Sequence, residues 1–185
     1  MSFRPGLSHC FPNAGVEEVP RAGAIRITVI RRFAVSKTTV LFVCPDNAFL
    51  SPLAEAYMNA RGEGIVRAFS AGLVPAPELH AAARRLLSAH GLQADGLTPK
   101  SLDVFLQPLA PALDRIIYLA DLPKGDLSAI RGDAPAIDVW RIADALPRPE
   151  SFETCAAMFD CICDAIDDVL DPPVHPEAVY RVLAG

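Results

Sequence analysis

One uninterrupted apolar run, followed closely by a proline at a helix start, constrains the fold more than any other feature of the sequence. Residues 40–43 carry only β-branched, leucine and aromatic side chains, which is typical of a strand buried on both faces. Cys44 stands where that strand should end. Ser51 and Pro52 then predict a helix N-cap followed by proline at the first helical position, where a missing N–H group costs nothing. A thiol is therefore expected beside backbone N–H groups and over a helix N-terminus, a position that lowers a thiol pKa and attracts anions.

Segments with strand and helix patterns alternate along the rest of the chain. Further strands are predicted over residues 65–69, 115–120 and 136–140. Helices are predicted over 52–61 and 77–90, as a short piece starting near 98–102, and from Ser151 to the residue before Pro172. Parallel strands joined by helices need crossover connections, so this pattern predicts an α/β domain, a three-layer sandwich around a four-stranded parallel sheet. Ligands bind such sheets at the carboxyl ends of the strands, and Cys44 lies at one of those ends.

The two ends of the chain lie outside this pattern. Residues 1–37 are expected to form an N-terminal extension that is either partly disordered, as its proline- and glycine-rich first 23 or so residues suggest, or carries an extra strand over 24–30. Such a strand would lie on a sheet edge or against a second copy of the chain, which leaves a homodimer open. Residues 38–171 are the predicted domain, and residues 172–185 are a C-terminal tail with room for one short helix.

Charge and hydropathy exclude several classes of partner. The chain has 22 acidic and 17 basic residues, a formal net charge of −5, and no lysine or arginine cluster longer than two. Nucleic acid is therefore not an expected partner. No apolar run approaches the roughly 18 residues needed to cross a bilayer, and the N-terminus lacks the pattern of a signal peptide. We expect a cytoplasmic protein that does not bind membranes.

The cysteines give no sign of a metal site or a disulfide framework. There are five of them, an odd number at no zinc-like spacing, and no histidine is placed as a co-ligand. The sequence therefore predicts no metal and no cofactor. Cys155 belongs to a stripe at helical spacing and is expected in the core; the stripe comprises Cys155, Met158, Phe159, Ile162, Ile166 and Val169. Cys161 and Cys163 lie off that stripe, and no role is assigned to them.

The order of the motifs resembles that of the low molecular weight protein tyrosine phosphatases and of the thioredoxin-coupled arsenate reductases that share their fold. The resemblance covers about residues 38–171. It rests on the strand, loop and helix start around Cys44, on Ser70-Ala71-Gly72, on Gly91 with Lys100-Ser101-Leu102, on the segment 114–121 and on the segment 140–144. It implies a parallel sheet with strand order 2-1-3-4.

The resemblance also implies roles for individual residues. Cys44 would attack phosphorus as a thiolate, and Asp144 would protonate the leaving oxygen and later activate water. Asn47 and Ser51 would support the loop and the thiolate. Backbone N–H groups of the loop and one arginine, six residues after the cysteine, would hold the phosphoryl oxygens. The loop residues concerned are Asp46, Asn47, Ala48, Phe49, Leu50 and Ser51.

Four loop positions depart from the pattern of that family. Leu50 stands where the arginine would be, and the loss of such a group is worth about 10³ to 10⁵ in rate, or roughly 4 to 7 kcal/mol. Pro45 removes one backbone N–H group from the loop. Asp46 adds a negative charge beside the anion site and opposes a Cys44 thiolate. Phe49 occupies the place of a second loop cysteine, which removes the nearest partner for a thiol relay.

The sequence therefore predicts a phosphatase-like fold with impaired phosphate chemistry, a pseudophosphatase that acts as a binding or regulatory module. Its partner would be an unidentified protein or a phosphorylated ligand, held by a pocket that Phe49, Leu50 and Trp140 make more apolar. The alternative is an active cysteine-dependent phosphatase, or an arsenate reductase, that uses Cys44 and Asp144 with a substitute cation. Arg141 is the candidate cation, because its loop should face Cys44.

Overall fold

The computed structural model describes residues 37–142 and 151–171 of the chain. The elements of this part are β1 (Thr38–Cys44), α1 (Leu50–Arg61), β2 (Val66–Gly72), α2 (Ala81–Ala89), the 3-10 helix η1 (Leu102–Leu106), β3 (Arg115–Tyr118), β4 (Ala136–Val139) and α3 (Phe152–Leu170). They include a 4-stranded sheet in the order β2-β1-β3-β4, and all its strand pairs are parallel. The predicted three-layer α/β fold and the 2-1-3-4 order are thereby confirmed.

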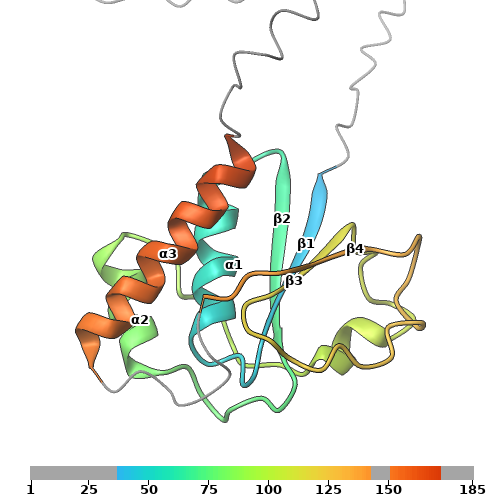
Figure 1. Ribbon diagram of the computed structural model, residues 1–185, viewed down its shortest axis with the longest axis horizontal. Coiled ribbons are helices and arrows are strands. Elements are labelled where there is room, and N and C mark those ends of the chain that lie inside the picture. Colours follow the sequence, from blue (N-terminus) through green and yellow to red (C-terminus); the bar gives the residue numbers. More distant parts are fainter. Residues whose placement is uncertain (1–36, 143–150, 172–185) are drawn as a thin grey trace, which may run out of the picture. The chain divides into compact units, whose positions relative to one another are not determined.

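Helices α1, α2 and α3 lie on one side of the sheet (Figure 1), and two hydrophobic clusters lie on its opposite faces. One cluster joins Phe42 and Ile117 to side chains of α1, α2 and α3. The other joins Leu41 and Tyr118 to side chains of η1. Successive β1 side chains therefore point to alternate faces, and the strand is buried on both, as residues 40–43 predict.

The register of the sheet brings the carboxyl ends of β1 and β2 together. Cys44, the last residue of β1, lies opposite Gly72, the last residue of β2. Strand β2 thus continues three residues past its predicted end at residue 69, because residues 70–72 keep their pairing with β1. The loop that follows Cys44 is consequently packed beside the end of β2.

Helix α2 begins later than the sequence pattern predicts. The predicted start at residue 77 is wrong, because the helix begins at Ala81 and His80 is its N-cap. The Nδ1 atom of His80 accepts a hydrogen bond from the backbone N–H of Ala82 at 3.3 Å. Before the helix, the N–H groups of Ala76 and His80 donate to carbonyls of the loop after β1. These long-range bonds hold residues 76–80 against that loop and delay the helix start.

Helix α3 begins where the sequence predicts. Ser151 is its N-cap, and the serine hydroxyl accepts a hydrogen bond from the N–H of Thr154 at 3.0 Å. Cys155 is buried in the core together with Phe159, Ile162 and Ile166. The predicted stripe is wrong at its end, since Val169 is 41% exposed. It lines an open cavity of about 470 Å³ at the amino end of the sheet.

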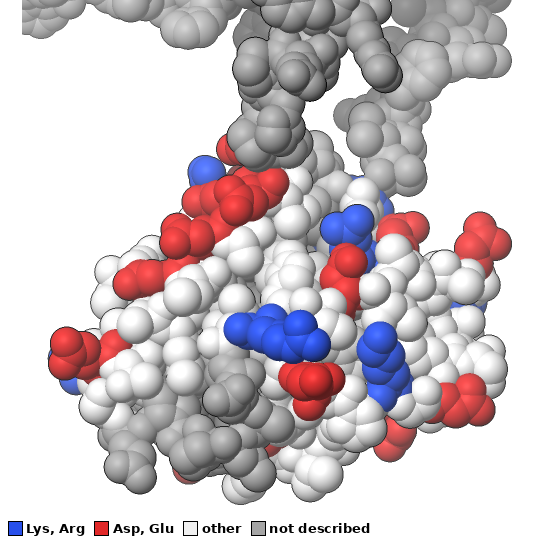
Figure 2. Space-filling model, viewed as in Figure 1, with Lys and Arg blue, Asp and Glu red and all other residues white. Residues whose placement is uncertain are grey.

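The outer face of α3 is acidic. Figure 2 shows acidic side chains gathered along this helix, which carries the exposed Asp160, Asp164 and Asp168. Asp167 of the same helix forms an ion pair with Arg61 of α1 at 2.9 Å. Both partners are partly exposed, so this pair adds little stability but fixes the end of α1 beside α3.

Several expectations lie outside the described residues. They concern the extension and its strand over 24–30, the tail over 172–185 and the position of Asp144. Among the helices of residues 37–142 and 151–171, none combines the length and the apolar character needed to cross a membrane.

Candidate active-site loop

The loop of residues 45–49 joins β1 to α1 at the carboxyl edge of the sheet. Neighbouring backbone holds it in place. The N–H of Val74 donates to the carbonyl of Pro45 at 3.0 Å, and the N–H of Ala76 donates to the carbonyl of Asp46 at 2.8 Å. The N–H of His80 donates to the carbonyl of Ala48 at 2.9 Å. The loop conformation is therefore fixed by the segment that follows β2.

The turn at Asn47 requires a glycine in the next strand. Asn47 is fully buried and has a φ of 51°, in the left-handed region that asparagine tolerates better than most residues. A Cβ atom on Gly72 would lie 2.7 Å from the backbone N of Asn47 and 2.8 Å from the carbonyl carbon of Asp46. The loop and β2 can approach this closely only because residue 72 has no side chain.

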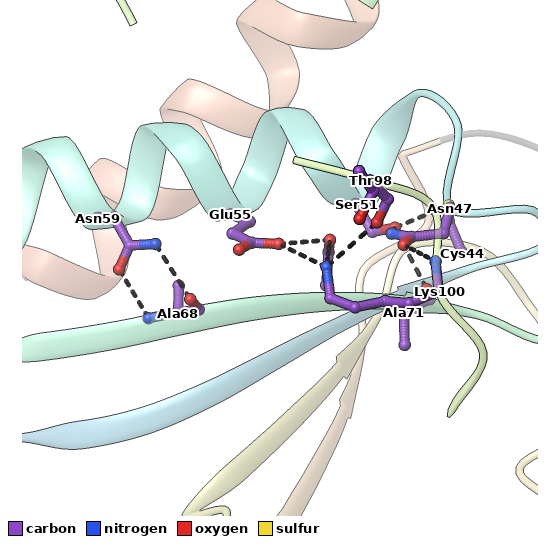
Figure 3. A network of polar contacts seen from close by, with 10 residues as sticks. Cys44, Asn47, Ser51, Glu55, Asn59, Ala68, Ala71, Thr98 and Lys100 are labelled. Atoms are coloured by element: carbon purple, nitrogen blue, oxygen red, sulfur yellow. Dashed lines mark hydrogen bonds and ion pairs between the residues drawn. The ribbon is translucent and has the colours of Figure 1, made fainter. Parts of the chain in front are cut away.

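A buried hydroxyl connects the thiol to the loop (Figure 3). The Oγ atom of Ser51 lies 2.9 Å from the Sγ atom of Cys44 and accepts a bond from Nδ2 of Asn47 at 2.8 Å. It also donates to the carbonyl of Ala71 in β2 at 3.3 Å. The Oδ1 atom of Asn47 accepts the backbone N–H of Lys100 at 2.8 Å. We call Asn47, Ser51, Gly72 and Lys100 the loop frame.

Ser51 does not have the predicted capping role. Helix α1 begins at Leu50, and its N-cap residue is Phe49, which makes no side-chain cap hydrogen bond. Ser51 is already the second helical residue, and its hydroxyl is committed to Cys44, Asn47 and Ala71. Pro52 still fits, because it lies in the first turn, where its missing N–H has no intrahelical acceptor.

A charged pair behind the loop was not foreseen from the sequence. Lys100 Nζ lies 3.5 Å from Oε2 of Glu55 in α1, and the hydroxyl of Ser70 in β2 donates to the same carboxylate. The side chains of Lys100 and Glu55 are only 24% and 14% exposed. The pair draws the segment before η1 onto α1 and β2 (Figure 3). Ser70, Lys100 and Glu55 all belong to segments that carry the family resemblance. Nothing in the sequence around Glu55, however, shows that it pairs with Lys100, 45 residues later.

The pKa of the Cys44 thiol is raised, as the Asp46 carboxylate predicts and contrary to what the helix start alone predicts. Burial is the largest influence and raises its pKa above the ordinary value, and the nearby Asp46 carboxylate raises it further. The hydroxyl and backbone N–H of Ser51 and the N–H of Asn47 lower the pKa, but they do not offset burial. The Ser51 hydroxyl has one hydrogen, which it can donate either to the carbonyl of Ala71 or to Cys44. The S–H of Cys44 can donate to Ser51 or to Oδ1 of Asp46. The site therefore suits a neutral thiol.

We call Pro45, Asp46, Phe49 and Leu50 the grip positions, because these are the four loop positions whose departures from the family pattern act against anion binding or thiol chemistry. Phe49 and Leu50 are 6% and 8% exposed and belong to the hydrophobic cluster that contains Cys44. The Phe49 ring lies edge-on to His80, with centroids 5.7 Å apart. The Oδ1 atom of Asp46 accepts the backbone N–H of Ala48 at 3.0 Å. None of the four positions offers a cation.

Arg141 follows β4 and forms a long ion pair with Asp121, with 3.8 Å between Nη2 and Oδ2. Both side chains are more than 70% exposed. Trp140, the third residue named for the pocket, is partly buried, and its ring centroid lies 5.8 Å from that of Phe42. In the described ranges, no group of three or more histidine, cysteine, aspartate or glutamate side chains is placed to hold a metal ion.

Comparison with known proteins identifies a family that the sequence matches. Residues 39–169 match the sequence profile of the low molecular weight phosphotyrosine protein phosphatase family. No curated protein sequence gives a significant match.

Solved structures with the same fold include reductases and a phosphatase. The chain is 25% identical to a thioredoxin-dependent arsenate reductase of Corynebacterium glutamicum, with a TM-score of 0.55, and the match covers 72% of this chain but only 60% of the reductase. It is 26% identical to an arsenate reductase of Archaeoglobus fulgidus, with a TM-score of 0.53 and coverage of 71% and 98%. The low molecular weight protein tyrosine phosphatase of T. tengcongensis, at 22% identity and a TM-score of 0.57, shares the fold over 73% of this chain and 99% of its own.

Proposed function

The chain belongs to the low molecular weight phosphotyrosine protein phosphatase family, and from that premise we propose that it is a catalytically impaired member that acts as a binding or regulatory module. In this proposal the protein binds a partner, and the β1–α1 loop serves as a rigid support in place of a catalytic site. Turnover of a phosphate ester is not its role.

The observation that carries the proposal is that residue 50 is a buried leucine. Its side chain stands at the sixth position after Cys44 and is packed in the hydrophobic cluster at 8% exposure. An isobutyl group cannot donate the paired hydrogen bonds that a guanidinium gives to phosphate, nor can it neutralise charge in the transition state. By analogy with arginines in other phosphoryl-transfer enzymes, this loss alone costs about 10³ to 10⁵ in rate.

The thiol supports the same conclusion independently. A cysteine attacks phosphorus as a thiolate, and enzymes of this chemistry lower the pKa of the thiol. Here burial raises the pKa of Cys44, and Asp46 adds to the effect. The nucleophile would thus be protonated at neutral pH, while the group that should attract the substrate is missing.

The alternative is an active cysteine-dependent phosphatase or arsenate reductase. The contacts among Cys44, Asn47 and Ser51 favour it, because they are the contacts that would orient a thiolate if one formed. A phosphatase would need Arg141 to leave Asp121 and act as the cation. A reductase would need a second thiol, and the other free cysteines of the described chain all lie on α3, at Cys155, Cys161 and Cys163.

Hydrolysis of an aryl phosphate separates the two proposals. The full chain and its Cys44→Ser variant are assayed side by side, with thermal melting curves to show that both fold. We expect equal, background-level hydrolysis from the two proteins. Hydrolysis that disappears in Cys44→Ser would establish an active phosphatase. A parallel assay of arsenate reduction with thioredoxin tests the reductase in the same way.

A further inference from the structure

The carboxylate of Asp46 contacts a backbone N–H group of the loop and lies near the sulfur of Cys44. Its Oδ1 atom accepts the backbone N–H of Ala48 at 3.0 Å. The same oxygen lies 3.9 Å from the Sγ atom of Cys44. A carboxylate oxygen is therefore both hydrogen-bonded to a loop N–H group and close to the sulfur.

An external oxyanion would have to satisfy these two conditions as well. A concave turn of backbone binds phosphate through its N–H groups, and a nucleophilic sulfur needs the reacting atom about 3 to 3.5 Å away. The loop has already lost one N–H group at Pro45. Of those that remain, the N–H of Ala48 is committed to Asp46, and the N–H groups of Asn47 and Ser51 face Sγ of Cys44. An incoming anion would find these three donors engaged and a negative charge beside them.

We infer that Asp46 is an internal ligand of this loop and the residue that excludes phosphate from it. The inference rests on the proposed function, since it explains how a loop with the family's fold avoids binding the family's anion. It assigns to Asp46 a specificity role that is separate from the loss of arginine at position 50.

The size of the effect follows from Coulomb's law for two charges in close contact. Two unit charges about 4 Å apart near a protein surface repel strongly enough to change an equilibrium constant by about 10² to 10³. The N–H of Ala48 adds to this figure, because a donor that is released from an ionised acceptor becomes available to the ligand. Removal of the Asp46 carboxylate should therefore strengthen phosphate binding measurably, even with Leu50 in place.

The test measures equilibrium binding of inorganic phosphate to the full chain by isothermal titration or by amide chemical shifts. Asp46→Asn removes the charge but keeps an oxygen acceptor for Ala48, and Asp46→Gly removes both. The matched control is Glu78→Gln, which deletes one exposed carboxylate from the neighbouring segment without touching the loop. Melting curves for all variants show that each one folds.

We expect phosphate affinity to rise by about 10²-fold or more in Asp46→Gly and to rise less in Asp46→Asn. Glu78→Gln should bind phosphate no better than the unmodified chain. The inference is overturned if both Asp46 variants fold and bind phosphate as weakly as the unmodified chain, or if Glu78→Gln gains as much. Because binding is measured without turnover, this result is independent of the aryl phosphate assay that tests the proposed function.

Discussion

The loop frame and the grip positions meet at one short loop, yet they differ in their contacts. The frame is hydrogen-bonded throughout, with Asn47 and Ser51 fully buried and each joined to a different part of the fold. The grip positions contain a proline, a carboxylate and two buried apolar side chains. The frame therefore stabilises the fold without a ligand, because it ties β1, β2 and α1 together. Groups that hold an anion contribute only when an anion binds. Fold and chemistry can separate within a few residues.

The largest expected effect comes from restoring one grip position. Leu50→Arg should raise aryl phosphate hydrolysis by about 10³-fold over the Cys44→Ser background, the lower end of the range for such arginines, since Pro45 and Asp46 remain. Leu50→Gln is the matched control, because it is polar but carries no charge. If Leu50→Arg folds and its hydrolysis stays at the background, the claim that the loop frame is intact and only the grip positions are lost would be contradicted.

A second substitution breaks the frame. Gly72→Ala would place a Cβ atom 2.7 Å from the backbone N of Asn47, so the loop or β2 must move. Overpacking of this kind costs about 1 to 3 kcal/mol, occasionally more, and we expect the upper part of that range because backbone cannot rotate away. Urea denaturation measures the loss.

Gly64→Ala is the control for that experiment. Gly64 has a φ of 89°, but a methyl group there would meet nothing within 4 Å, so only the backbone cost of about 1 to 2 kcal/mol applies. If Gly72→Ala destabilised the protein no more than Gly64→Ala, the close approach of β2 to the loop would not be essential.

Ser51→Ala tests the buried hydroxyl of the frame. The change leaves the Asn47 amide buried without its acceptor and should cost about 1 to 3 kcal/mol. It should also raise the pKa of Cys44 further, because the Ser51 hydroxyl lowers it. Urea denaturation and the pH dependence of Cys44 alkylation measure the two effects. Ser88→Ala, an exposed position on α2, should change neither. An unchanged thiol pKa in Ser51→Ala would argue against the contact.

The smallest effect concerns pH. Because burial raises the pKa of Cys44, the folded protein keeps the proton at a pH where the unfolded chain releases it. The contribution to stability is complete below the unfolded pKa of about 8.5 and is lost as pH rises through the folded pKa. Relative to Cys44→Ser, the free energy of unfolding should fall above pH 8.5 by up to about 1.4 kcal/mol per pH unit. The other cysteines are present in both proteins and cancel. Parallel curves for the two proteins would mean that the thiol is not shifted.

The fold could be predicted because its signals are local. The apolar run before Cys44, the break at Gly72 and the cap at Ser151 each depend on a few adjacent residues, and their order led to the family. The late start of α2 could not be predicted, since it depends on bonds from Ala76 and His80 to a loop about 30 residues earlier.

The residues of the candidate site could be predicted from the sequence, but their hydrogen bonds and the pKa of the thiol could not. The sequence marks Cys44 and Ser51, but it could not show that the Ser51 hydroxyl is taken up by Asn47 and Ala71 in place of capping the helix. The helix start predicts a lowered thiol pKa and Asp46 predicts a raised one, and the sequence alone could not decide between them. A helix start is visible in the sequence, whereas the burial of the sulfur by Phe49, Leu50 and the rest of the cluster depends on the whole fold.

The most direct test of the central claim is a crystal structure of the full chain grown with a high concentration of phosphate. The claim is that the frame is present and the grip is absent. It predicts that Asn47, Ser51 and Lys100 keep the contacts described above, that Asp46 stays on the N–H of Ala48, and that no tetrahedral anion lies over Cys44. A phosphate held by the loop N–H groups, with Arg141 turned from Asp121 to reach it, would contradict that claim.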